Sequence, residues 1–391
     1  MLSVRVAYSW ALLFLYFYIF SVVARVYAGF DLVALSLLLV FISLALTSCS
    51  ILLSTFKGGL QVVNSHAFAL FFLWLLGFAF YVVTSGFWYH ASPFYPLIMV
   101  VSIFSGLVLS RLGNEKIFSV FRLFYFLILL PLAVAIFTSF VVGKDLQIIH
   151  PQNRNSLSAA VVFAQLAYSF SYCRLYRVVP TITPFLSVLI CIGLYGRSGI
   201  LVSVVILVFT LLFQFGRSLK FKIFLGMAIP IMLIVFVSMY SDVSTYLADN
   251  TNFSRGLDSP RNLKNFEYLS SMNFLHFIVG GDLALSPTIV FYGMNPHNSL
   301  VLGHALLGIP YFFMISYVFV VLLRKRAIVS FIFCSIFILR AFFDTVALPG
   351  IYDAIFFYMF FSFEKMKIPR LMITTVTDRR DGMPDVNGHQ N

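Results

Sequence analysis

The first thirty residues, "MLSVRVAYSWALLFLYFYIFSVVARVYAGF" (1–30), decide the class of fold. Arg5 is followed by an apolar stretch that is too long for the hydrophobic region of a secretory signal, and no small-residue cleavage site comes after it. We therefore expect this stretch to be the first membrane-spanning helix.

The composition of the whole chain extends this interpretation. Of the 391 residues 61% are hydrophobic, 47 are Phe, and only 10% are charged, whereas a soluble domain carries roughly a quarter charged residues. There are too few polar residues to cover a soluble globule. The apolar stretches are about 17 to 25 residues long, the length of a bilayer-spanning helix, and lack the alternation of a membrane β-barrel. The predicted fold class is an all-α, polytopic integral membrane protein.

Polar residues divide the chain into about twelve predicted spans. They lie near 7–24, 30–53, 67–85, 94–110, 119–141, 157–173, 179–195, 199–215, 221–240, 299–322, 327–345 and 350–363. Residues 1–240 thus hold nine spans with short loops, and 299–364 hold three. Residues 241–298 form one large hydrophilic loop, and the polar tail 365–391 is expected to be disordered.

The basic residues set the expected orientation. With the N-terminus inside, 18 of the 26 Lys and Arg residues fall on the cytoplasmic side, as the positive-inside rule requires. These are Arg5, Lys57, Arg111, Lys116, Arg122, Arg174, Arg177, Arg217, Lys220, Lys222, Arg324, Lys325, Arg326, Lys365, Lys367, Arg370, Arg379 and Arg380. Both termini are therefore predicted to be cytoplasmic. The net charge of +12 reflects topology, and no nucleic-acid partner is expected.

The other basic residues fall on the outer side, against this rule. They are Arg25, Lys144, Arg154, Arg197, Arg255, Arg261, Lys264 and Arg340. We interpret Arg25, in a short loop, as an interface anchor. The rest gather mainly in two loops (142–156 and 241–298) and at one span boundary, which indicates an anionic ligand on the outer face.

Two arginines stand where outer loops enter spans. In "YGRSG" (195–199) Arg197 lies between small residues that allow close approach, and the helix that follows would direct free N–H groups to the same place. In "IIHPQNRNSLSAA" (148–160) Arg154 precedes a span for which Asn155 or Ser156 is the expected N-cap. The alternatives are a snorkelling Arg197 in a tight turn and a solvated Arg154.

The large loop contains a predicted amphipathic helix in "SPRNLKNFEYLSSMNFLHFIVG" (259–280). Its apolar residues Leu263, Phe266, Leu269 and Phe274 fall near helical spacing, so the helix is expected to lie on the outer surface. Arg261 would stand at its N-terminus as an anion ligand. The acidic residues of the loop that could act as a base are Glu267, Asp258 and Asp282.

The stretch "GMNPHNSLVLGHALLGIPYF" (293–312) places His297 and Asn298 directly after a proline and before an apolar run. Asn298 or Ser299 can cap the span, which puts His297 at its mouth, where a group that titrates near neutral pH can exchange protons. His304 follows two turns later on the same face, so both histidines would line one cavity. The alternative for His304 is a hydrogen-bonded histidine in helix packing.

Three segments in this order resemble the O-antigen polymerase and ligase superfamily. They are "GRSGILVSVVILVF" (196–209), a long outer loop with Ser-x-Arg, and "PHNSLVLGHALLGIPYF" (296–312). The likeness covers about 190–315, a third of the chain. The chain departs from it in two ways: the loop arginine is either Arg255 or Arg261, and the arginine-to-glycine spacing of a repeated polymerase loop motif is absent.

The resemblance implies a GT-C-like inverting glycosyltransferase with one large periplasmic loop in the bacterial inner membrane. Its donor would be an undecaprenyl-diphosphate-linked oligosaccharide. By this resemblance Arg197 and a loop arginine, Arg255 or Arg261, would bind the donor diphosphate, and His297 would act at the reacting centre. We expect Arg261, Arg197 and His297 to be catalytic, and Arg154, Arg255, Asn298 and His304 to bind substrate. Outward arginines would replace a metal ion, and neither a metal nor another cofactor is expected.

The function that we expect first is an O-antigen polymerase, which would transfer the growing glycan from undecaprenyl diphosphate to an incoming lipid-linked repeat on the periplasmic side. Two other functions are compatible with these patterns. An O-antigen ligase, which transfers finished glycan to lipid A-core, shares the fold and site, and only the acceptor differs. A twelve-span flippase for lipid-linked oligosaccharides would instead place charges in a central two-sided cavity. The depth of Arg197, Arg340 and Asp344 discriminates the enzyme from the transporter. A polymerase would also meet a chain-length regulator and a flippase as partners.

Overall fold

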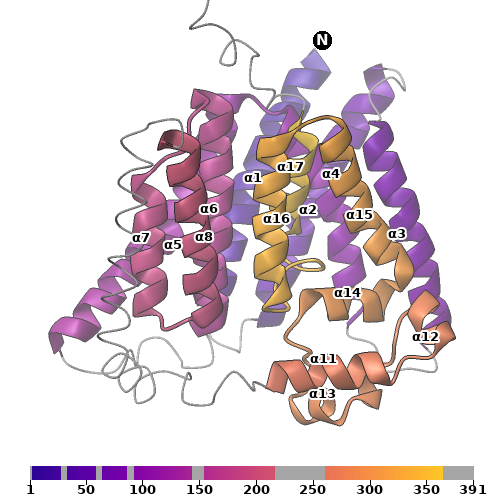
Figure 1. Cartoon of the computed structure of the whole chain (residues 1–391). Helices are drawn as coiled ribbons and strands as arrows, with labels where there is room; N and C mark the ends of the chain where they lie inside the picture. Colours follow the sequence, from indigo (N-terminus) through magenta and orange to yellow (C-terminus); the bar gives the residue numbers. More distant parts are fainter. Residues whose placement is uncertain are drawn as a thin grey trace, which may run out of the picture.

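The computed structural model describes residues 2–27, 33–58, 64–85, 92–142, 154–215 and 260–363. Every regular element within these ranges is helical (Figure 1). The first eight helices are α1 (Leu2–Tyr27), α2 (Val33–Gly58), α3 (Ser65–Thr84), α4 (Phe94–Arg111), α5 (Asn114–Val142), α6 (Arg154–Tyr176), α7 (Ile182–Gly193) and α8 (Arg197–Phe215). The later elements are α11 (Pro260–Ser270), α12 (Phe274–Val279), the 3-10 helix η5 (Leu283–Leu285), α13 (Pro287–Phe291), α14 (Ser299–Leu307), α15 (Ile309–Arg324), α16 (Ile328–Phe342) and α17 (Asp353–Phe361).

Six of these helices are long and apolar enough to cross a membrane: those at 9–27, 65–84, 94–111, 114–142, 154–176 and 197–215. Shorter apolar helices occur at 38–49, 182–193, 309–324 and 328–342. The chain is therefore a helical protein with the character of a membrane protein. The predicted span at 221–240 and the predicted disordered tail lie outside the described residues.

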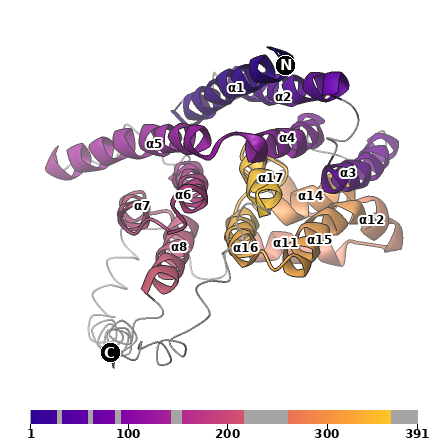
Figure 2. The ribbon, with the colours of Figure 1, turned by 90° about the horizontal axis from the view of Figure 1, so that it is seen from above.

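The bundle is organised around α6 and α17, which lie near its centre when it is viewed from above (Figure 2). Helix α6 is buried without interruption from Leu157 to Ser171, and every residue of α17 is buried. Many α6 residues are Ala or Ser, small side chains that let helices approach closely. By contrast, Phe137 and Phe140 of α5 are exposed apolar residues, as expected of a surface in contact with lipid.

Helices α11 to α13 lie together at one end of the bundle, which we call the α11 end (Figure 1). Helix α14 lies next to α11 to α13 and runs crosswise to the long helices of the bundle (Figure 1). The sequence predicts one continuous span over 299–322, but the structure breaks it at Gly308, which separates α14 from α15. Gly308 has φ +61°, and a Cβ there would lie 2.3 Å from the Ile278 carbonyl oxygen. Only glycine fits this turn without strain.

Candidate functional site

Arg154 and Arg197 begin two neighbouring helices, α6 and α8. Their starts are in contact because Gly196 and Gly199 pack on Ser158: a Cβ on either glycine would lie 2.9 Å or less from the Ser158 side chain. The guanidinium carbon of Arg154 lies 5.7 Å from the centre of the Tyr195 ring. The small residues of the "YGRSG" segment thus allow the close approach that the sequence predicts. The predicted N-cap of α6 is wrong, because the helix already begins at Arg154.

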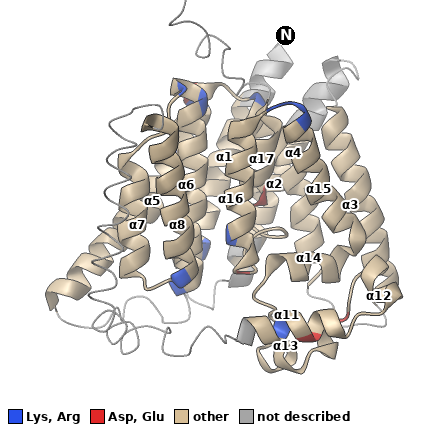
Figure 3. Ribbon diagram, viewed as in Figure 1, with Lys and Arg blue, Asp and Glu red and all other residues tan. Residues whose placement is uncertain are grey.

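A third arginine joins this corner from the end of α16. Arg340 has an exposed fraction of 0%, and its Nη2 donates a hydrogen bond to the Asn155 carbonyl oxygen (3.0 Å). The same nitrogen lies 3.6 Å from Asp344 Oδ2. The Nε of Arg154 is buried and has no hydrogen-bond partner among the described residues. Arg154 and Arg340 therefore lie at the first turn of α6, Arg197 begins the helix packed beside it, and one carboxylate lies next to Arg340. Figure 3 shows basic residues near the ends of α6, α8 and α16 on this side.

The helix starts add to the positive potential of this corner. The first N–H groups of α6 and α8 have no partners within their own helices, and the helix dipoles place partial positive charge there. Both arginines occupy the first position of their helices. Together these groups could hold an anion with several oxygens, such as a phosphate or diphosphate.

His297 lies in a turn that enters α14, connected to the arginine corner through Asp344. The Asp344 carbonyl oxygen accepts a hydrogen bond from Ser299 Oγ at the first position of α14. Asn298 caps the helix as predicted, with its Oδ1 accepting from the Leu300 N–H (2.9 Å). His297 itself has φ +53° and is partly exposed. Left-handed backbone is uncommon for a residue with a side chain, so the surrounding contacts must hold this turn in place.

Those contacts come from α11 and from the segment after α16. Asn295 Oδ1 accepts hydrogen bonds from the His297 N–H (2.8 Å) and from Thr345 Oγ1 (3.1 Å). Lys264, with an exposed fraction of 1%, donates from Nζ to the Asn295 carbonyl oxygen (2.8 Å) and lies 4.1 Å from the centre of the Tyr292 ring. That ring meets the His297 ring edge-on at 6.5 Å. Lys264 therefore positions the backbone and one ring around His297.

His304 does not share a cavity with His297, contrary to the sequence prediction. Its ring is buried, with Nδ1 2.7 Å from the Tyr268 hydroxyl and Nε2 3.0 Å from the Phe277 carbonyl oxygen. Since a carbonyl only accepts, Nε2 carries the proton and Nδ1 accepts from the tyrosine. The ring thus connects α14 to α11 and α12. The alternative interpretation, a hydrogen-bonded histidine in helix packing, describes this geometry.

Glu267 and Asp282, two acidic residues of the large loop, stabilise the fold of that loop. Glu267 accepts hydrogen bonds from Ser286 Oγ (2.5 Å), Thr288 Oγ1 (2.7 Å) and the Thr288 N–H (2.9 Å). These bonds, that of Ser286 first, lower the pKa of the Glu267 carboxyl. Asp282 Oδ1 accepts from the Ala284 N–H (2.8 Å). A carboxylate with a lowered pKa is a weak base, so His297 remains the better placed proton acceptor among these residues.

The predicted surface helix corresponds to α11 and α12, with a break between Ser270 and Phe274. The apolar residues Leu263, Phe266 and Leu269 lie on the exposed side of α11, and Phe266 has an exposed fraction of 68%. Lys264 and Tyr268 occupy the buried side. Arg261 is the second residue of α11. Arg255, Asp258 and Lys144 lie outside the described residues.

Sequence patterns miss most of the residues that support His297. In the sequence, Lys264 and Arg340 differ from other polar residues only in being basic residues predicted on the outer side of the membrane. Asn295 and Thr345 carry no sequence signal, because their partners come from distant segments. Within the described ranges no group of three or more His, Cys, Asp or Glu side chains is arranged to hold a metal ion. Cys173, Cys191 and Cys334 are buried free thiols.

The fold and these contacts define a helical protein with membrane-type helices and a polar, positively charged corner at its α11 end. No protein-family model, no curated protein and no solved structure matches the chain.

Proposed function

We propose that the protein is an O-antigen polymerase, a metal-independent inverting glycosyltransferase of the GT-C-like type with about twelve spans. It would lie in the inner membrane of a Gram-negative bacterium, with both termini in the cytoplasm and the α11 end in the periplasm. It would transfer the growing glycan from undecaprenyl diphosphate to an incoming lipid-linked repeat. The observation that carries the proposal is the convergence of Arg154, Arg197 and Arg340 at the end of the bundle where His297 lies.

The proposed reaction is a substitution at the anomeric carbon of the donor sugar. The acceptor hydroxyl oxygen forms a bond to that carbon while the bond from the carbon to the diphosphate oxygen breaks. Undecaprenyl diphosphate leaves with the electron pair, and the hydroxyl proton passes to His297. Arg154 and Arg197, with the helix starts beside them, stabilise the charge that develops on the leaving diphosphate. Arg261, near the start of α11, is the loop arginine that we assign to the same task.

The position of the charged residues favours an enzyme over a flippase. Arg340 and Asp344 contact the first turns of α6 and α14, on the side of the bundle where α11 to α13 lie. A transporter would place ionisable groups near the middle of the membrane, between two related halves. The ligase stays the second candidate, because the same corner would serve it and only the acceptor would differ.

The proposal is tested by a lipopolysaccharide gel of a strain from which the chain has been deleted. A polymerase predicts core carrying a single repeat with the ladder lost, and recovery of the ladder by the wild-type chain but not by Arg197→Ala. Bare core would exclude the polymerase and leave the ligase or the flippase. The membrane face that holds the stranded lipid-linked oligosaccharide would then separate these two: the periplasmic face for a ligase, the cytoplasmic face for a flippase.

A further inference from the structure

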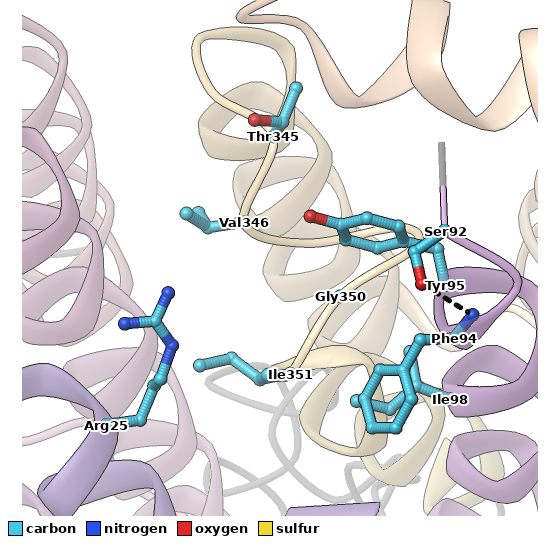
Figure 4. A pocket seen from close by; sticks show the side chains of 9 residues that line it. All are labelled: Arg25, Ser92, Phe94, Tyr95, Ile98, Thr345, Val346, Gly350 and Ile351. Carbon is cyan, nitrogen blue, oxygen red and sulfur yellow. Dashed lines mark hydrogen bonds between the residues drawn. The ribbon is translucent and has the colours of Figure 1, made fainter. Parts of the chain in front are cut away.

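A cavity of about 330 Å³ lies at the same end of the protein, apart from the arginine corner. Its walls come from the last turn of α1, the first turns of α4 and the segment between α16 and α17 (Figure 4). This volume is within the range of small-molecule sites. Arg25 contributes the charge, and Ser92, Tyr95 and Thr345 contribute hydroxyl groups.

Arg25 is positioned as a ligand-binding cation. In Figure 4 its guanidinium extends from α1 toward Val346 and Ile351 on the opposite wall. No hydrogen bond or ion pair engages Arg25 within the described part of the chain, whereas Arg340 has Asp344 beside it. Arg25 is partly exposed in the last turn of α1, where the C-terminal end of the helix favours a cation, so its guanidinium keeps its charge at the cavity and is available to an anion. The planar fork of arginine fits the oxygens of a phosphate.

The other walls indicate what carries this anion. Phe94, Ile98, Val346 and Ile351 make most of the lining apolar, which favours a hydrocarbon chain. A sugar would require many more hydrogen-bonding groups than the three hydroxyls provide. The outward side of α1 carries exposed apolar residues, among them Leu13 and Phe20, so a chain bound near Arg25 could continue along the lipid-facing surface.

We infer that the Arg25 cavity is a second anion site, separate from the Arg154–Arg197 corner, for a phosphate ester carried on an isoprenoid or acyl chain. The Arg25 guanidinium binds the phosphate, and the apolar walls contact the start of the chain. This assignment replaces the interpretation of Arg25 as an interface anchor.

The cavity also has a direct connection to the candidate base. Thr345 lines the cavity and donates a hydrogen bond to Asn295, whose side chain binds the His297 N–H. The proposed function assigns the donor diphosphate to the Arg154–Arg197 corner, so the ligand of the Arg25 cavity is the acceptor lipid; this last step alone rests on the proposed function.

The test uses protection of a thiol introduced into the cavity wall. Ser92 is exposed and lines the cavity, so Ser92→Cys, in a Cys49→Ser background that removes the exposed native thiol, reports occupancy. The full-length protein in detergent is treated with a charged thiol reagent, with and without farnesyl phosphate. At ten times its Kd the probe should slow modification about elevenfold, because only unoccupied protein reacts.

Comparison of probes identifies the recognised group. Farnesol should not protect the introduced thiol, and protection equal to that by farnesyl phosphate would overturn the anion site. Inorganic pyrophosphate should protect weakly, since it lacks the chain. Lysophosphatidic acid, tested beside farnesyl phosphate, separates the two sources: stronger protection by one probe assigns the isoprenoid or the acyl chain.

Variants separate this site from its surroundings. Arg25→Gln should abolish protection, while Arg197→Gln and the exposed Arg324→Gln at the opposite end should retain it. Protection that survives Arg25→Gln, or disappears with Arg197→Gln, would overturn the proposal.

Direct binding of labelled farnesyl phosphate provides a second measurement: wild type should bind one equivalent more than both Arg25→Gln and Val346→Trp, which fills the cavity. Equal binding by all three proteins would overturn it as well. These results are independent of the lipopolysaccharide gel, so either proposal can fail alone.

Discussion

Arg174 and Arg340 are two fully buried arginines at opposite ends of the bundle, and their surroundings differ in kind. Arg174 Nη2 donates to the carbonyl oxygens of Ser110 (2.8 Å) and Leu112 (2.9 Å), where α4 ends. Arg340 lies beside the start of α6 and near Arg154. The C-terminal end of a helix carries partial negative charge and attracts a cation, whereas the N-terminal end carries partial positive charge and, like a neighbouring cation, repels one. The charge of Arg174 is compensated by the fold, while the corner around Arg340 retains excess positive charge that an anion can neutralise.

The strongest test of this difference is the loss of a cation from the positive corner. Arg197→Ala should lower the rate of polymer formation by about 10²–10³, the usual cost of removing one preorganised group that stabilises developing charge. Densitometry of the lipopolysaccharide ladder against protein level in membranes measures this. Arg324→Ala, at the opposite end, is the matched control. A normal ladder from Arg197→Ala would remove the basis for the proposed leaving-group site.

His297→Ala should lower the same rate by about 10²-fold or more, as expected for a general base, without changing the thermal denaturation temperature. His304→Ala provides the contrast, because it removes the hydrogen bonds to Tyr268 and Phe277 and should lower that temperature. If the two variants exchanged these effects, the roles assigned to the histidines would be wrong.

Methionine substitutions compare the two buried arginines directly. Arg174→Met leaves the Ser110 and Leu112 carbonyls without a buried donor, at about 1–3 kcal/mol for each group, so the protein should denature at a lower temperature. Its polymer yield per folded molecule should not change. Arg340→Met should reduce that yield. Equal loss of yield from both variants, at matched folded levels, would show that position in the bundle does not distinguish them.

Lys264→Met tests whether α11 positions the His297 turn. Removal of the bond to Asn295 should lower the rate of polymer formation about tenfold, the factor that corresponds to about 1.4 kcal/mol. Lys264→Arg, which retains a donor, should recover part of the rate. The pH profile of the residual activity should shift in Lys264→Met, since the surroundings of His297 change. An unchanged profile and rate would limit Lys264 to a structural role.

The smallest expected effect concerns Glu267 and acid. Its pKa is lowered in the folded protein by Ser286 and Thr288, so its stabilising contribution is present above its unfolded pKa, about 4.3, and is lost as the pH falls through the lower folded value. Limited proteolysis between pH 5 and pH 3 should show the contact between α11 and α13 loosening in the wild type. Glu267→Gln should be cleaved at a rate that is nearly independent of pH in this range.

The sequence predicts the helical membrane class and most helix positions because hydrophobic length and charge are local properties. The helix at 94–110 and the cap at Asn298 agree with the structure within a residue. The break at Gly308 was not predicted, since the carbonyl that excludes a side chain there belongs to Ile278, thirty residues earlier.

The candidate site could be predicted only in part. Sequence patterns single out Arg154, Arg197 and His297, but not the bonds that connect them. In a membrane every helix is apolar, so hydrophobicity does not specify which helices are neighbours. Small residues such as Gly199, which packs on Ser158, specify instead which helices are neighbours.

By itself the sequence determined that this chain is helical, apolar enough for a membrane, and supplied with cations where topology does not require them. Only the tertiary structure decided what those cations do. It placed Arg174 against helix-end carbonyls, Arg340 among helix starts, and Arg25 in a cavity. The physical reason is that a buried charge acquires its role from the dipoles and charges around it, and these come from segments distant in the chain.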